Sequence, residues 1–192
     1  MRRLFGLVFA VFVGVSPAFA EAVRAPSTTA LVTARSEIIL DALRYSEAWL
    51  TTQDSIKGDA EWQCLTKALY FEARGETLKG QFAVAEVILN RVESPRFPDT
   101  VCGVVGQGGT KRHACQFSFM CDGKPETISE PNAWKTVGKV AHAAMRLDGS
   151  LTNGATHYHT TAVRPRWSRV YDRVAKVGDH IFYRHDWQDA NG

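Results

Sequence analysis

Residues 59–92 read DAEWQCLTKALYFEARGETLKGQFAVAEVILNRV, and this stretch decides the fold. Asp59 is a residue type whose side chain accepts hydrogen bonds from the first free N–H groups of a helix, so it predicts a helix start. The apolar residues that follow recur at helical spacing and make one stripe along the predicted helix, namely Leu65, Ala68 and Leu69. The stretch therefore begins with an amphipathic helix whose stripe should face a core.

A second helix is predicted directly after the first. Helical character fails at Arg74 and Gly75, and Thr77 can cap the helix that follows. Residues 82–92 are apolar nearly all round, which is typical of a helix buried on every side. We therefore expect two helices joined by a short turn, with the second one deep in the domain.

Glu72 is the carboxylate in this stretch whose pKa should be raised. It lies three residues beyond Leu69 and so continues the buried stripe. It also lies at a helix C-terminus, where the macrodipole disfavours negative charge. Both effects favour the protonated form, which a general acid needs near neutral pH. The alternative is an ordinary glutamate that is solvated or paired with Arg74.

Two further carboxylates have other expected roles. Glu76 lies just before the second helix, where an N-terminus stabilises the charged form, so we expect it to cap, to position substrate or to act as a base. Glu86 lies within the apolar helix with Asn90 one turn away. A buried carboxylate needs hydrogen-bond partners, so a structural pair is the expected role for Glu86.

The remaining elements predict a helix-dominated α+β domain. A helix capped by Ser36 should run to about Leu50, and a long one should run from about Pro131 to Leu147 with Gly149 as its stop. A short helix over 99–105, a loop over 106–124 and extended segments over 156–163 and 174–183 complete the list. A turn at Gly178-Asp179 divides the last segment.

The N-terminus has the pattern of a secretory signal peptide. Arg2 and Arg3 precede an apolar run over 4–15, and Ala18-Phe19-Ala20 resembles a cleavage site. We expect a signal peptide over 1–20, a linker and N-terminal helix over 21–58, and a catalytic domain over 59–188. An uncleaved anchor is the alternative, but the apolar run is short for a membrane span. The mature protein should have no stable membrane anchor and should be periplasmic or secreted.

The charge of the mature chain excludes some partners. Of 23 basic residues, 21 remain without Arg2 and Arg3, against 20 acidic ones. This balance does not predict nucleic-acid binding, which needs a concentrated basic face, nor a membrane-surface helix.

The even number of cysteines in an exported chain predicts disulfides. Of the three possible connectivities we favour Cys115–Cys121, which closes a short loop, together with Cys64–Cys102. A zinc site is the alternative, but paired Cys-x-x-Cys spacings are absent from the sequence.

Five ordered blocks resemble the SleB/CwlJ-type cell wall hydrolase family. They are ALYFEARGE, GQFAVAEVILNRV, SPRFPDTVCGVV, CQFSFMCDG and GATHYHT with WSR, and together they span about residues 64–182. The resemblance implies a compact lysozyme-like domain in which Glu72, at a helix end, is the catalytic acid. It also implies lytic transglycosylation of peptidoglycan between N-acetylmuramic acid and N-acetylglucosamine, without a cofactor or metal. In that reaction the muramic acid 6-hydroxyl attacks the anomeric carbon, so the second carboxylate of a hydrolysing glycosidase is not needed.

Several other residues are candidates for substrate binding. Gln116 and Ser118 carry amide and hydroxyl groups suited to sugars, and a 115–121 disulfide would hold their loop in place. His157 and Tyr158 are cleft candidates, as are Trp167 and Arg169, and Glu76 completes the set. A metal site using the His157-x-His159 pair with His180 or His185 is the alternative.

Three rival functions accompany the lytic transglycosylase. A hydrolytic muramidase would need Glu76 or an acidic residue of the 106–130 loop about 6.5–9.5 Å from Glu72. A zinc amidase or peptidase would use the histidines, and a silent wall-binding module would bind without turnover. The sequence does not identify a regulatory protein that controls the activity.

Overall fold

The computed structural model describes residues 27, 31–33, 35, 36, 39, 43–53, 58–109, 115–149 and 151–185. The predicted signal peptide lies outside these residues and stays a prediction. None of the helices formed by the described residues is long and apolar enough to cross a membrane. The chain divides into two compact units, residues 1–36 and 37–192, and the second contains every element named below.

Ser36 does not cap a helix, which corrects the sequence prediction. It lies inside a helical turn, and its hydroxyl donates to the carbonyl oxygen of Val32 at 3.0 Å. The cap is Ser46, whose side-chain oxygen accepts from the N–H of Trp49 at the start of α2 (Glu47–Thr51). Both serines can cap by type, and a tertiary contact decides between them.

That contact is the packing of α2 and of Tyr45 on α4, all within the second unit. Leu50 is buried, and the rings of Tyr45 and Trp49 lie 5.0 and 6.0 Å from the ring of Phe82. The helix starts where its apolar side chains can reach this surface.

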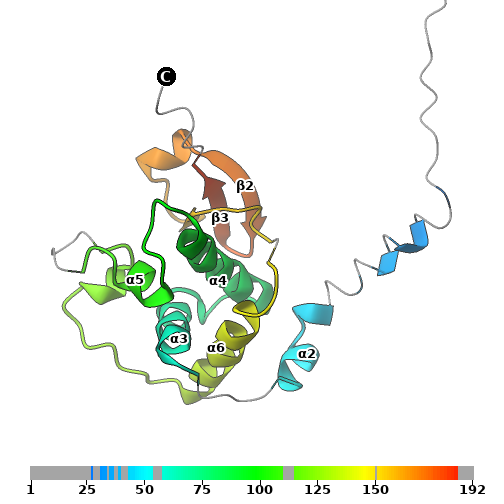
Figure 1. Cartoon of the computed structure of the whole chain (residues 1–192), viewed down its shortest axis with the longest axis horizontal. Helices are drawn as coiled ribbons and strands as arrows, with labels where there is room; N and C mark the ends of the chain where they lie inside the picture. The colour runs from blue at the N-terminus through cyan, green and yellow to red at the C-terminus, as the bar shows by residue number, and fades with distance from the viewer. Residues whose placement is uncertain are drawn as a thin grey trace, which may run out of the picture. The chain divides into compact units, whose positions relative to one another are not determined.

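Helices α3 (Ala60–Ala73) and α4 (Leu78–Glu93) form the centre of the domain, as predicted (Figure 1). The Asp59 side chain accepts from the N–H of Trp62 at 2.9 Å, and Thr77 accepts from the N–H of Gly80 at 3.2 Å. The predicted stripe of α3 is fully buried, with Leu65, Ala68 and Leu69 all at 0% exposure. Local capping and apolar periodicity therefore determine both helices.

Helix α6 (Pro131–Ala144) packs against α3, and the two approach closely at Gly138. The indole N–H of Trp62 donates to the carbonyl oxygen of Gly138 at 2.8 Å, and a Cβ on Gly138 would lie 3.1 Å from the Trp62 ring. Glycine is therefore the residue that allows this indole to lie against α6.

Helix α6 ends at Ala144, and a further turn closes with the N–H of Leu147 donating to the carbonyl oxygen of Ala143 at 3.1 Å, so the predicted end lies within one turn. Glu86 of α4 binds the chain that follows. Its carboxylate accepts from the backbone N–H groups of Leu151 and Thr152 at 2.9 Å each. Asn90 donates to the Thr152 hydroxyl at 3.3 Å. The structural role expected for Glu86 is confirmed, although both side chains pair with Thr152 and not with each other.

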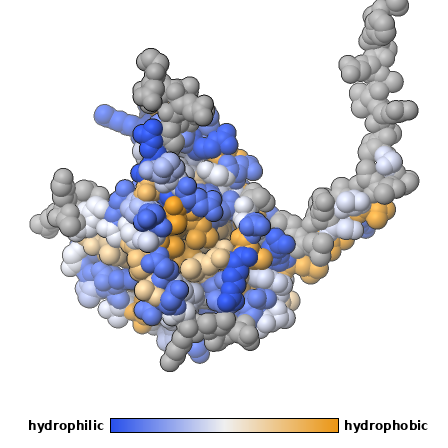
Figure 2. Space-filling view, in the orientation of Figure 1, coloured by the Kyte–Doolittle hydropathy of each residue, from blue (hydrophilic) through white to orange (hydrophobic). Residues whose placement is uncertain are grey.

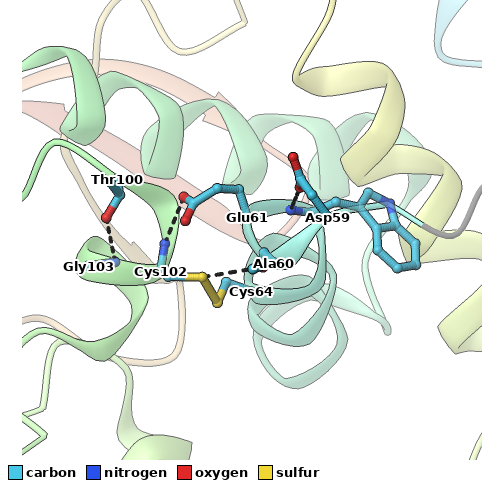
Figure 3. The surroundings of a disulfide bond; sticks show 8 residues. Asp59, Ala60, Glu61, Cys64, Thr100, Cys102 and Gly103 are labelled. Atoms are coloured by element: carbon cyan, nitrogen blue, oxygen red, sulfur yellow. Dashed lines mark hydrogen bonds between the residues drawn. A yellow bond between two sulfur atoms is a disulfide. The ribbon is translucent and has the colours of Figure 1, made fainter.

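Helix α5 (Val101–Gly106) is tied to α3 by the disulfide Cys64–Cys102 (Figure 3). Beside this bond the Glu61 carboxylate accepts from the backbone N–H of Cys102 at 3.1 Å, and Thr100 caps α5 through Gly103. The second bridge is Cys115–Cys121, so both predicted pairings are confirmed and all four cysteines are bridged.

A small antiparallel sheet of order β1-β3-β2 completes the domain. Its strands are β1 (His157–Thr160), β2 (Asp172–Val177) and β3 (His180–Arg184). Strands β2 and β3 form a hairpin whose turn contains Gly178 at φ +57°, a conformation that favours glycine. β2 contacts α4, so the sheet lies at one side of the helices (Figure 1). The α+β class is confirmed.

Candidate active site

Glu72 lies in the last turn of α3 with a partly buried carboxyl group. The hydroxyl of Tyr158 donates to its Oε2 at 3.4 Å. Burial raises the pKa of Glu72 above its ordinary value, while the hydrogen bond from Tyr158 and the positive charge of Arg91 lower it less. The predicted direction is confirmed, and desolvation is its main cause. A carboxyl group in this state can hold a proton closer to neutral pH than a free one.

Arg74 is not the counter-charge of Glu72. Its Nε donates to Glu130 at 2.8 Å, its Nη1 donates to the carbonyl oxygen of Tyr70 at 3.1 Å, and its guanidinium lies over the Tyr70 ring. The alternative of a Glu72–Arg74 pair is therefore wrong.

Tyr158 and His157 are neighbours on β1, so their side chains point to opposite faces of the sheet. The side chain of Tyr158 is the one on the face toward Glu72. Its ring packs against His180 and Phe182 of β3, with centroids 5.1 and 6.0 Å apart. Burial and the charge of Glu72 raise the pKa of Tyr158 well above its ordinary value, so its hydroxyl stays a donor. Of the predicted substrate-binding residues, Tyr158 is the one in direct contact with Glu72.

Arg91 is the site residue that sequence reasoning missed. It lies in α4 and is only 2% exposed, and its Nε donates to the carbonyl oxygen of Thr156 at 2.7 Å. Its guanidinium lies over the rings of Phe97 and Phe117, at 5.4 and 5.6 Å from the centroids. Burial lowers the pKa of Arg91 to about 10, so the side chain stays charged at neutral pH. An arginine inside an apolar helix was the available signal, because a buried charge needs partners.

Gln116 meets Arg91 at the start of the disulfide loop. With its amide oxygen turned toward the guanidinium, Gln116 accepts from Nη1 and Nη2, each at 3.2 Å. The side chain is otherwise exposed. Gln116 is thereby joined to the same arginine whose charge acts on Glu72.

Ser118 begins the 3-10 turn η1 (Ser118–Met120) and is exposed. The next residue, Phe119, stacks on Phe71 of α3 with 4.7 Å between ring centroids. Because Phe71 directly precedes Glu72, this stack holds the disulfide loop against the end of α3. The structure thus places Ser118 on a loop next to the site without bringing its hydroxyl to Glu72.

Glu76 is held by the protein on both carboxylate oxygens. Its Oε1 lies 3.1 Å from Nδ1 of His180, and its Oε2 accepts from the backbone N–H of Asp179 at 3.3 Å. The structure thus joins Glu76, in the α3–α4 turn, to the β2–β3 turn.

His157 faces away from Glu72, into a cluster of rings on the other side of the sheet. Its ring lies 4.8 Å from Tyr171, 5.5 Å from Trp167 and 6.2 Å from Phe97. Burial, then the charges of Arg91 and His185, lower the pKa of His157 to about 4, so the imidazole is neutral near pH 7. Trp167 therefore contacts His157 in this cluster, while Arg169 is exposed at the end of the 3-10 turn η2 (Arg166–Arg169), and a role of either in a cleft stays a prediction.

Among the described residues, three or more His, Cys, Asp or Glu side chains nowhere gather in a way that could hold a metal ion. His159 of β1 and His180 of β3 have other contacts. Nε2 of His159 lies 3.1 Å from the Tyr183 hydroxyl, and His180 faces Glu76.

A pocket of about 670 Å³ lies along α4, and Arg91 is not part of its wall. Apolar side chains gather over α4 on the face drawn in Figure 2. The pocket wall mixes apolar groups with carboxylates, among them Phe82, Leu89, Leu147, Glu93, Asp99 and Asp148. Neither Glu72 nor Tyr158 lines this pocket. The candidate active site is therefore identified by the contacts and raised pKa of Glu72, and not by the size of a cavity.

Comparisons with known proteins agree with this fold. Residues 75–183 match the cell wall hydrolase family, and the match begins three positions after Glu72. A spore cortex-lytic enzyme of Halalkalibacterium halodurans is 36% identical over 127 residues, which are 65% of this chain and 34% of that protein. A spore cortex-lytic enzyme of Bacillus cereus is 33% identical over 120 residues, which are 62% of this chain and 42% of that protein. The chain thus spans well under half the length of these relatives.

One solved structure is similar over nearly its whole length. It is the catalytic domain of the germination-specific lytic transglycosylase SleB from Bacillus anthracis, which is 30% identical with a TM-score of 0.52. The match covers 68% of this chain and 99% of that domain. The chain belongs to the cell wall hydrolase family, and the resemblance to SleB-type enzymes seen in the sequence is confirmed.

Proposed function

We propose that this protein is an exported enzyme that cuts peptidoglycan glycan strands by lytic transglycosylation, with Glu72 as general acid. The bond cleaved joins N-acetylmuramic acid to N-acetylglucosamine. The observation that carries the proposal is the Glu72 carboxyl group, partly buried, raised in pKa and hydrogen-bonded by a tyrosine that stays protonated. Family membership and the likeness to a lytic transglycosylase domain support the same reaction.

The reaction needs one carboxyl group used twice. Protonated Glu72 gives its proton to the glycosidic oxygen as the bond from the anomeric carbon to that oxygen breaks. The muramic acid 6-hydroxyl then bonds to the anomeric carbon and returns its proton to the Glu72 carboxylate. The product carries a 1,6-anhydro ring, and Glu72 is again protonated. The Tyr158 hydroxyl stabilises the carboxylate between the two proton transfers.

The positions of the other carboxylates favour this route over hydrolysis by two acids. Glu76 is engaged by His180 and by a backbone N–H. The acidic residues of the 106–130 loop have partners of their own, since Glu126 pairs with Lys67 and Glu130 with Arg74. Asp122 accepts from the backbone N–H of Lys124. These contacts support a route that needs no second carboxylate as base.

The test is product analysis on purified sacculi digested by wild type, Glu72→Gln and Glu76→Gln. We expect anhydro-muramic ends from wild type and from Glu76→Gln, and a loss of about 10²–10⁴-fold in rate for Glu72→Gln. Circular dichroism and thiol titration check that both variants fold with intact disulfides. Reducing ends from wild type would indicate a muramidase, and more than a tenth of wild-type activity in Glu72→Gln would exclude this residue as the acid.

A further inference from the structure

Arg91 connects two parts of the candidate site, the chain just before Tyr158 and the disulfide loop that carries Gln116. One side of its guanidinium is fixed by the Thr156 carbonyl oxygen, next to the strand that carries Tyr158. Its two terminal nitrogens bind Gln116 on the disulfide loop. A buried cation held on three elements has a fixed position, so its charge acts on its neighbours from a constant direction.

The first group that Arg91 acts on is Glu72, because Arg91 holds the Thr156 carbonyl oxygen two positions before Tyr158, the residue that donates to Glu72. The groups that act on this carboxyl from the elements packed against it are Tyr158 of β1 and Arg91 of α4. Arg74 faces Glu130, and Glu76 faces His180 and Asp179, so neither competes with them. Arg91 is therefore the cation that favours ionised Glu72, the form that must exist between the two proton transfers.

The second neighbour is Gln116. Because both Nη groups are donors, they hold the amide oxygen of Gln116 and leave its NH₂ group for other partners. The side chain is exposed, so the NH₂ group is available to ligands in solution. Arginine's planar fork can impose this orientation, whereas lysine's ammonium is a point charge and cannot.

We propose that Arg91 is a positioning residue for glycan cleavage, which stabilises ionised Glu72 and orients Gln116 as a hydrogen-bond donor to a carbonyl group of the glycan. The proposed substrate carries such a carbonyl group, which can accept this hydrogen bond, in the N-acetyl group of each amino sugar along the strand. The inference rests on the proposed function for its substrate, but its electrostatic half concerns Glu72 alone.

The test compares Arg91→Gln, Arg91→Lys, Gln116→Ala and the matched control Arg74→Gln, all in the full chain. Soluble uncross-linked glycan strands are the substrate for rate–pH profiles and KM. Carbon-13 NMR of labelled glutamate, assigned with Glu72→Gln, follows the ionisation of Glu72 without any glycan. This second readout separates the inference from the proposed function, because it holds or fails whatever reaction the enzyme performs.

Each variant has a distinct expected result. Arg91→Gln moves the Glu72 titration and the basic limb of the rate profile to higher pH. Arg91→Lys keeps both near wild type but raises KM about two- to tenfold, the loss of one net hydrogen bond. Gln116→Ala raises KM by the same factor and leaves the titration unchanged. Arg74→Gln changes neither.

Two results would overturn the inference. One is a Glu72 titration in Arg91→Gln that does not move, and the other is a KM in Arg91→Lys that equals that of wild type. Should the glutamine variant fail to fold, Arg91→Met serves as the neutral replacement. Arg91→Lys and Gln116→Ala test the Gln116 half by themselves, so that half can still be refuted if another variant misfolds.

Discussion

Replacing both cysteines of each disulfide by alanine gives two variants whose stabilities should differ in a known order. In the chain-entropy model, a bridge stabilises the folded state by restricting the unfolded chain, and more so for a longer loop. Cys64 and Cys102 are 38 residues apart, which gives about 4 kcal/mol at 25 °C. Cys115 and Cys121 are 6 residues apart, which gives about 2 kcal/mol.

Urea and thermal unfolding would measure both losses. For a chain of this size each kcal/mol corresponds to about 2–4 °C, so Tm should fall by about 8–16 °C without the longer loop and 4–8 °C without the shorter one. Activity should show the opposite order, because only the 115–121 loop carries Gln116. Adding reductant to wild type should reproduce the combined loss.

The reasoning would be refuted by a larger stability loss in the Cys115/Cys121 variant than in the Cys64/Cys102 variant. It would also fail if reduced and oxidised wild type unfolded at the same temperature. In either case, loop closure would not be the main contribution of these bridges.

The remaining predictions concern metal dependence, pH and packing. Activity should survive EDTA. If EDTA abolished activity and added zinc restored it, the zinc amidase or peptidase that uses the histidines would be favoured. Because folding raises the pKa of Glu72, its ionised form destabilises the protein above the folded-state pKa, an effect that vanishes below about pH 4, the ordinary value. Glu72→Gln should therefore have an equal or higher Tm at pH 7, and a clearly lower Tm would indicate a structural ion pair. Tyr158→Phe removes a hydrogen bond that lowers the pKa of Glu72, so its rate profile should have the basic limb at higher pH, and an unmoved limb would contradict this. Trp62→Phe loses the 2.8 Å bond to Gly138 and should lower the free energy of unfolding by about 1 kcal/mol with activity retained, as urea unfolding would measure.

The sequence predicted those elements whose signals are local. Asp59 and Thr77 cap the helices expected of them, because a cap needs only the three residues that follow it. Ser36 has the same side chain as Ser46 and still does not cap, since the contact of Tyr45 with Phe82 decides where α2 begins. Both serine side chains can cap a helix by their chemistry, but tertiary packing determines that Ser46 is the cap.

The candidate site was predictable from the sequence at Glu72, because two separate sequence signals fall on this one residue. Glu72 is marked by its place on a buried stripe and at a helix end, and burial does raise its pKa. The role of Arg91 depends on Thr156 and Gln116, which are distant in sequence from α4. Periodicity cannot reveal such partners, so an arginine in an apolar helix was visible in the sequence but its contacts were not.

The position of Tyr158 depends on the last strand that the structure describes. Strand β1 pairs with β3 and with no other described strand, and Tyr158 lies opposite Phe182 in that pairing. A slip by one residue would turn Tyr158 away from Glu72 and bring a histidine in its place. A chain that has not yet emerged as far as His180 lacks the strand that sets this register. Glu72 therefore gains the hydrogen bond from Tyr158 only once β3, which follows the described α-helices in the chain, is available to pair with β1.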